Sequence, residues 1–390
     1  MDVSYLPLEV IQNNIRKADG FQFLLIWNES ITSEEMKVPF RNAAQQLTDL
    51  IESKVKHVVI CSAITTGLTE SSTSLVTLES YESLREIYNS STTNHTVRNQ
   101  LFQHNLPVVN PFDATSTFFV TTAQLQAFNV TYPLDLLPNE IFINFEQKQY
   151  NYDLTGSCLH ELTETMGRIG GFENQGYVYK SLMDLCAYKN EHTRSAHYEP
   201  NAYFSFDAGT SKVSEFNTNT QSDAMDWNGT QFPNDCCNAF ANNSECLSAD
   251  DLLVLHTMGF DISPIQYDFL SLEIPLHTHI EPLKNNFANI LGIEKFHLTP
   301  SLPKGLVFSE ETGTISGKAM QLSPVTTYSV TVESNRLDEL SLAGHFSLGT
   351  VPNNAEVFTP LVIAGIVLGG LFFLIIILLL VLHLCGKLSF

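Results

Sequence analysis

The segment SCLHELTETMGR, residues 157–168, holds a histidine and two glutamates at spacings that suit metal chemistry. Residues four apart lie on one face of a helix, so the side chains of His160 and Glu164 can reach a single ion. Glu161 is turned about 100° away and can stand beside a water molecule on that ion. Zn²⁺ accepts both imidazole nitrogen and carboxylate oxygen. The spacing therefore predicts a zinc site in which Glu161 is the general base.

A plain amphipathic helix could also contain these residues, because a His-Glu pair followed by a glutamate one turn later occurs on many solvated helices. The neighbouring residues favour the metal interpretation. Leu159, Leu162 and Met166 are apolar, and polar side chains among apolar neighbours need partners. Gly167 stands where a glycine that ends a helix is expected.

The segments before this helix indicate alternating strands and helices. Residues 21–27 and 57–64 are apolar and β-rich, and they flank residues 38–55, where apolar side chains recur every three to four positions. That order is β-α-β. A short strand is expected at residues 141–145, before the helix that carries His160. These elements are expected to hold the polar side chains in place.

After Pro264 the pattern changes to alternating runs, such as residues 326–334, separated by turns. This pattern predicts an all-β sandwich. The segment LPKGLVFSEETGTISGK, residues 302–318, resembles the signature of immunoglobulin-like domains found on bacterial and eukaryotic surface proteins. Gly305, Gly313 and Gly317 occupy the glycine positions of that signature, and the resemblance covers roughly residues 263–351.

The segment GSCLHELTETMGRIGGF resembles the metal-binding helix of a family of secreted bacterial zinc metalloproteases, which is related in pattern to the metzincins. Other segments match that family in order. They are LP at 106–107, TTAQ at 121–124, DLCAY at 184–188, AYFSFDAG at 202–209, DAMDW at 223–227 and DLLVLHTMGFD at 251–261. The resemblance runs from about residue 21 to residue 261 and implies a metzincin-like domain that hydrolyses peptide bonds.

The third metal ligand stays open under this resemblance. Where a metzincin supplies its third histidine, the chain has Gly170, which cannot bind a metal. Asp184 is preferred because it stands in a matched motif and carries a carboxylate, and His192 and His197 are the alternatives. The resemblance also leaves Cys186 in place of an aromatic residue, and one expected disulfide joins it to Cys158. The predicted metal ligands are His160, Glu164 and Asp184.

Charge and the chain end bear on partners and location. The 390-residue chain carries 20 Lys and Arg against 42 Asp and Glu, a net charge of −22, with no basic stripe. Nucleic-acid binding is therefore excluded. Residues 361–382 have no polar side chain, and this apolar segment is long enough to span a membrane as a helix. Lys387 follows the span, so the tail is expected in the cytoplasm.

The rest of the chain is expected outside the cytoplasm. Six cysteines precede the apolar segment, as disulfides in an oxidising compartment would require. The N-terminal residues do not have the basic and apolar regions of a signal peptide, so export would need a start that this sequence does not show. Glycosylation sequons occur at Asn28, Asn89, Asn94, Asn129, Asn228 and Asn242.

The sequence thus predicts an α+β metzincin-like metalloprotease domain (residues 1–262), an all-β immunoglobulin-like sandwich (263–352), a linker (353–360), a transmembrane helix (361–384) and a cytoplasmic tail (385–390). The predicted function is that of a membrane-anchored extracellular zinc endopeptidase acting on proteins or peptides. The alternative is a catalytically inactive adhesion or receptor ectodomain that keeps the fold. Glu161 favours the enzyme, because an inactive copy does not need the base.

Overall fold

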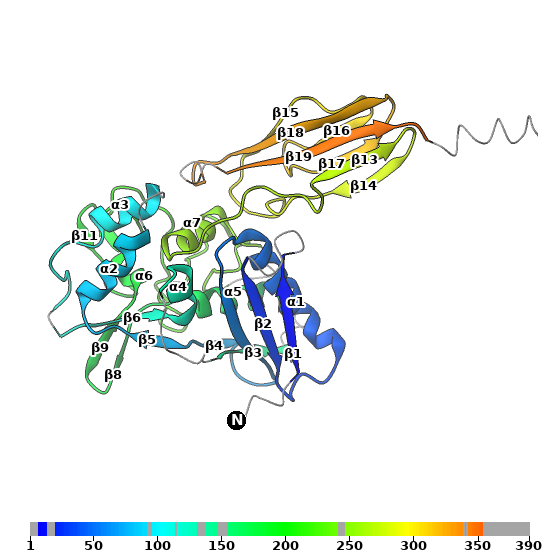
Figure 1. Ribbon diagram of the computed structural model, residues 1–390. Helices are drawn as coiled ribbons and strands as arrows, with labels where there is room; N and C mark the ends of the chain where they lie inside the picture. The colour runs from blue at the N-terminus through cyan, green and yellow to red at the C-terminus, as the bar shows by residue number, and fades with distance from the viewer. Residues whose placement is uncertain are drawn as a thin grey trace, which may run out of the picture.

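The structure is a computed structural model that describes residues 7–13, 20–91, 96–113, 115–130, 138–146, 154–240, 246–337, 340 and 342–353. Figure 1 shows two units. The N-terminal unit holds all the helices of the described residues, and the second unit is a pair of β-sheets that follows α7 (Ala249–Thr257).

A five-stranded sheet forms the base of the N-terminal unit, in the order β1-β2-β3-β7-β4. Its central strands β2 (Gln22–Trp27), β3 (Lys56–Ile64) and β7 (Asn139–Asn144) are parallel, and the edge strands β1 (Leu8–Gln12) and β4 (Glu70–Ser72) run antiparallel to their neighbours. The sequence of β2, QFLLIW, is apolar almost throughout, because a parallel strand is covered on both faces.

Two helices pack together beside this sheet. Helix α1 (Glu34–Leu50) starts at Ser33, whose side chain accepts a hydrogen bond from the Met36 amide, and it buries one apolar face that includes Phe40 and Leu47. Helix α5 (Leu154–Met166) packs against α1 and carries two of the three predicted metal ligands, His160 and Glu164. It ends at Gly167, which has a φ of +127° and lies so close to the Gln124 side chain that a Cβ would meet it at 2.7 Å.

The remaining elements of the N-terminal unit are short. The helices are α2 (Tyr81–Ser91), α3 (Thr96–His104), α4 (Thr122–Ala127) and α6 (Leu182–Leu185). One sheet has the order β5-β6-β9-β8, from β5 (Leu75–Thr77), β6 (Thr117–Thr121), β9 (Tyr177–Lys180) and β8 (Phe172–Asn174). Another has the order β11-β10-β12, from β11 (Thr193–Arg194), β10 (Ala187–Asn190) and β12 (Tyr203–Phe204).

The second unit consists of two sheets with a buried apolar interior that includes Phe296, Ile315 and Tyr328. One sheet has the order β13-β19-β18-β15, from β13 (Ser271–Pro275), β19 (Ala343–Val351), β18 (Ser323–Glu333) and β15 (Lys295–Thr299). The other has the order β14-β17-β16, from β14 (His279–Leu283), β17 (Ile315–Lys318) and β16 (Leu306–Phe308).

Polar contacts join the two units. Arg336, which follows β18, lies with its Nε 3.2 Å from the Asp250 carboxylate at the start of α7. Its two terminal nitrogens donate to the carbonyl oxygens of Lys212 and Val213 at 3.0 Å. Asn286 donates to the carbonyl oxygen of Asp49, at the end of α1, at 3.0 Å. The second unit is therefore docked on the first.

The predicted fold class needs correction in its balance of helix and strand. The α+β prediction gave helices too much weight, because the described residues form nineteen strands and only seven helices, and β-sheet predominates. The polar stretch between α6 and α7 contributes the short strands β10 to β12, isolated bridges and turns.

The membrane prediction also needs correction. Within the described ranges, no helix combines the length and the apolar character that crossing a bilayer requires. The predicted transmembrane helix, residues 361–384, and the tail, 385–390, lie outside the described residues. Because no described helix meets the requirement for a membrane span, the prediction of a single-pass membrane protein with an extracellular body is corrected. The function considered below does not include a membrane anchor.

Candidate metal centre

Helix α5 and a loop that precedes α7 together orient the imidazole of His160. Its Nδ1 lies 2.9 Å from the carbonyl oxygen of Cys236, and because a carbonyl only accepts, Nδ1 is the donor. The other ring nitrogen, Nε2, faces two carboxylates, 3.5 Å from Glu164 Oε1 and 3.3 Å from Asp226 Oδ1. A histidine that binds a metal is usually fixed through its second nitrogen in this way.

Burial alone would lower the pKa of His160, but the carboxylate of Asp226 outweighs it and holds that pKa well above the ordinary value. Without a bound cation, the imidazolium is thus itself a positive partner for the two acids. A metal ion at this position would take over that charge.

Glu164 is held from both sides. Its Oε2 accepts a hydrogen bond of 2.8 Å from the hydroxyl of Ser71, on the edge strand β4, while Oε1 faces His160. Burial would raise the pKa of Glu164, but the hydrogen bond and charge of His160 and the charge of Arg168 lower it. Ser71 therefore holds the carboxylate in position, and His160 and Arg168 favour its ionised form.

Glu161 lies beside these two residues. Side-chain atoms of His160, Glu161 and Glu164 that could bind a metal all lie within 4.8 Å of one another. Glu161 is 5 % exposed, and among the described residues its Oε2 has no hydrogen-bond partner. Burial, followed by the negative charge of Glu164, raises its pKa well above the ordinary value. The orphaned oxygen is one observation that fits a site built for an ion and water.

Asp226 completes this centre, and no pattern in the sequence indicated a role for it. It is 1 % exposed, and its Oδ1 contacts both His160 and Arg168. Burial would raise its pKa, but His160 and Arg168 lower it to about 2. The next residue, Trp227, donates from Nε1 to Asp251 at 2.8 Å and so ties the loop to α7. The matched DAMDW segment was the available signal for this loop.

Arg168, two residues beyond the end of α5, balances the charge of the two carboxylates. Its Nη1 is 2.9 Å from Asp226 Oδ1, and its Nη2 is 3.8 Å from Glu164 Oε1. Its Nε donates to the hydroxyl of Thr163 at 3.1 Å. Burial would lower the pKa of Arg168, but Cys237, Asp226 and Glu164 raise it well above the ordinary value. The guanidinium is therefore a permanent cation in the centre.

Asp184 lies outside this group. Its Oδ2 accepts from the Ser181 amide and hydroxyl and from the Gly171 amide, at 2.8–2.9 Å, as the capping box of α6 requires. Its Oδ1 accepts from His197 Nε2 at 2.7 Å. The role of Asp184 as a metal ligand stays a prediction, but these contacts already use both of its oxygens.

The two alternative histidines lie in different surroundings. His192 has a side chain that is 74 % exposed and lies 3.6 Å from Glu191, so it is a surface residue. His197 lines the same cavity as His160, next to Gly170. A Cβ on Gly170 would meet the His197 ring at 3.1 Å, so the glycine makes room for this imidazole.

The expected disulfide between Cys158 and Cys186 is not formed. Among the described cysteines, Cys186 is a buried thiol without a disulfide, and the side chain of Asn105 donates to its sulfur at 3.5 Å. Burial raises its pKa to about 12.

The centre opens into a cavity of about 920 Å³. Strand β4 lines one side with Glu70 and Ser71, and the loop around Asp223 lines another. Burial, then the charges of Glu164 and Asp226, raises the pKa of Asp223 to about 6. Exposed apolar side chains stand at the rim, namely Leu68, Phe172 and Phe240. A cavity of this size with apolar and charged walls suits a segment of a larger molecule.

Comparison with known proteins identifies part of the second unit. A family model described as "Putative Ig domain" matches residues 285–349, which include β15 to β18 and most of β19. This match confirms the immunoglobulin-like domain predicted from the glycine-containing turns. No curated protein matches the chain with significant similarity.

Proposed function

We propose that the protein is a zinc-dependent endopeptidase that hydrolyses peptide bonds in protein or peptide substrates. The observation that carries the proposal is the convergence of His160, Glu161 and Glu164 within 4.8 Å at the wall of a large cavity. The donor set of one imidazole nitrogen and carboxylate oxygens fits Zn²⁺. The hydrogen bond from Nδ1 of His160 to Cys236 leaves Nε2 for the ion.

His160 Nε2 and Glu164 Oε1 would hold the ion. Asp226 is the preferred third ligand, because its Oδ1 lies 3.3 Å from the same Nε2 and faces the same space. This assignment replaces Asp184 in the proposal, since both oxygens of Asp184 serve α6 and His197. Arg168 would then keep its contacts with the carboxylates of Glu164 and Asp226 while the ion binds the same two groups.

A bound Zn²⁺ supplies Lewis-acid activation of a water molecule and of the substrate carbonyl. Residues of the chain transfer the proton and position the groups that react. The charge of the ion would offset that of Glu164 and favour the ionised form of Glu161. Oε2 of this carboxylate, which has no other partner among the described residues, would then accept the proton of the attacking water and pass it to the leaving amine. Ser71 keeps the Glu164 carboxylate in position, and the apolar rim excludes water from a bound peptide.

One observation favours a second candidate function. Arg168 already lies 2.9 Å from Asp226 and 3.8 Å from Glu164, so the acids are compensated without any ion. In a catalytically inactive protein of this fold, the cavity would bind a ligand and Arg168 would serve as the structural cation.

One experiment separates the two. The zinc content of the purified protein is measured, together with hydrolysis of an unfolded protein substrate by the wild type and by Glu161→Gln. The peptidase hypothesis expects about one zinc ion at the His160 centre of both proteins and hydrolysis by the wild type alone. Absence of hydrolysis, with the same zinc content in the wild type and in Glu164→Ala, would favour the inactive protein.

A further inference from the structure

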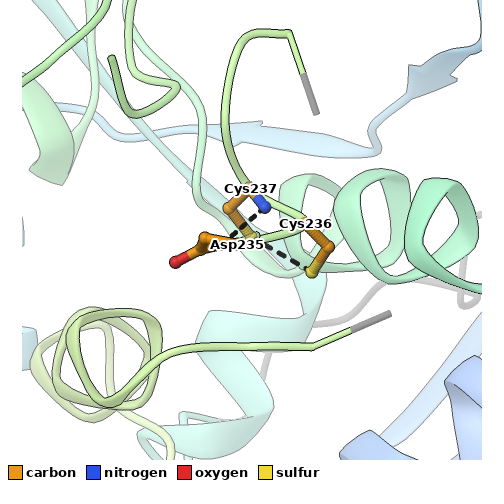
Figure 2. Close-up of side chains that lie close together, drawn as sticks. All are labelled: Asp235, Cys236 and Cys237. Carbon is orange, nitrogen blue, oxygen red and sulfur yellow. Dashed lines mark hydrogen bonds between the residues drawn. The ribbon is translucent and has the colours of Figure 1, made fainter. Parts of the chain in front are cut away.

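Three consecutive side chains near the proposed centre have no part in the proposed reaction. Asp235, Cys236 and Cys237 lie in the loop before α7, and Figure 2 shows their carboxylate and two sulfurs gathered at one place. They are almost fully buried, with exposed fractions of 0–1 %. One potential ligand atom from each residue lies within 4.8 Å of the others.

The distance between the sulfurs suits a metal chelate. Sγ of Cys236 and Sγ of Cys237 are 4.0 Å apart. Two thiolates on one tetrahedral Zn²⁺, with Zn–S bonds of about 2.3 Å, are separated by about 3.8 Å. A disulfide would need a separation of about 2.05 Å. The two cysteine side chains therefore need to move little to hold an ion together. They would need to move much further to form a disulfide with each other.

The backbone of this loop is well fixed. The amide of Cys237 donates to Oδ1 of Asp235 at 2.7 Å, and the dashed line that starts at the blue nitrogen in Figure 2 marks this bond. The amide of Cys236 donates to the carbonyl oxygen of Cys246 at 2.9 Å. The three ligand atoms are thus presented by a preorganised loop, which lowers the conformational entropy lost on binding an ion.

The surroundings also favour a cation. Asp235, in this loop, and Asp251, at the start of α7, are both buried, so two carboxylates lie away from solvent in this region. A metal ion that displaced the protons of the thiols would balance the resulting negative charge.

We propose that Asp235, Cys236 and Cys237 form a second metal site, specific for a thiophilic cation such as Zn²⁺, behind the His160 centre. Two thiolates and one carboxylate are a donor set that soft and borderline metals prefer over Mg²⁺ or Ca²⁺. The role of the ion is structural, because the side chains are buried away from solvent.

The site also supports the first centre. The carbonyl of Cys236 is the group that accepts the hydrogen bond of His160. An ion that holds the Cys236 side chain holds this carbonyl as well, and with it the direction of Nε2. The second site does not depend on the peptidase hypothesis, because it would bind metal in an inactive protein too.

Cadmium is the probe for the test. The full chain, kept reduced, is incubated with Cd²⁺, and thiolate-to-cadmium charge-transfer absorption and cadmium NMR are recorded. The His160 centre offers only nitrogen and oxygen, so both signals report on sulfur ligation. We expect sulfur-bound cadmium at about one ion per chain. A reduced, folded wild type without sulfur-bound cadmium would overturn the proposal, and this measurement needs no variant.

Variants then locate the site. Cys236→Ser and Cys237→Ser, made singly and together, should lose the sulfur signal, whereas the matched control Cys186→Ser should keep it, because Cys186 is buried elsewhere, beside Asn105. Glu164→Ala should keep it as well, which separates this proposal from the first. An unchanged sulfur–cadmium signal in the folded double variant would contradict the assignment. A disulfide between Cys236 and Cys237 would also contradict it, if reduction of that disulfide did not restore cadmium binding.

Discussion

The Nδ1 atom of His160 donates a hydrogen bond of 2.9 Å to the carbonyl oxygen of Cys236, seventy-six residues further along the chain. This bond sets the tautomer of the imidazole and turns Nε2 toward Glu164 and Asp226. Helix α5 alone could not do so, because a helix fixes the Cα position of a residue but leaves its ring free to rotate. The loop before α7 is therefore part of the centre.

Glu164 and Glu161 should give different phenotypes when they are changed. Glu164→Ala removes a proposed ligand, so zinc affinity should fall by more than about 100-fold. Glu161→Gln removes only the proton acceptor, so zinc should remain while kcat falls by about 10²–10⁴-fold. Metal analysis and a peptidase assay measure both. Glu173→Gln, on the exposed strand β8, is the control and should alter neither. Unchanged zinc affinity at the His160 centre in Glu164→Ala would show that Glu164 is not a ligand.

Asp226 and Asp184 should also be distinguishable. Asp226→Asn should weaken zinc binding, because its Oδ1 faces His160 Nε2 at 3.3 Å. Asp184→Asn should leave zinc bound but lower the free energy of unfolding by about 1 kcal/mol, as expected for a damaged capping box. Zinc titration and urea unfolding of each variant are the measurements. The opposite pattern would return the third-ligand role to Asp184.

Arg168 should matter most when no metal is bound. Arg168→Met leaves Asp226 and Glu164 without their buried cation, so the free energy of unfolding of the metal-free protein should fall by about 3–5 kcal/mol. Saturating zinc should reduce this loss, since the ion replaces the missing charge. The control Arg41→Met breaks a surface pair with Glu9 and should cost less than about 1 kcal/mol. An equal loss with and without bound zinc would mean that the ion and Arg168 do not share the acids.

Local geometry explains which parts of the centre could be predicted from the sequence. His160, Glu161 and Glu164 fall within about one helical turn, so their spacing alone predicts that they lie together. Asp226 could not be placed in this way, because it is fifty-eight residues from Arg168 and reaches it through a loop without regular structure. For Asp184 the sequence also offers a structural role, because Ser181 three residues earlier forms the S-x-x-D pattern of a helix cap.

The same distinction applies to the fold. The expected segments at residues 21–27 and 57–64 correspond to β2 and β3, because long apolar runs report burial directly. Helix α1 begins four residues before the expected start, at the Ser33 cap. Strand β4, which supplies Ser71, was missed because three residues, ESS, are too few to show alternation.

Stability should depend on pH through Asp250, which joins the two units. Burial raises its pKa to about 7 from an ordinary value of 3.8, with Asp251 adding to the shift and Arg336 and Ser214 opposing it. The folded state therefore holds this proton between about pH 4 and pH 7, where the unfolded chain releases it. The contribution of Asp250 to the free energy of unfolding must fall as pH rises through this window, by on the order of 4 kcal/mol at most. Urea unfolding at several pH values should show this decline in the wild type and in the exposed control Asp268→Asn, and a much weaker one in Asp250→Asn. An identical slope in all three would mean that Asp250 is ionised in the folded protein and that Arg336 outweighs its burial.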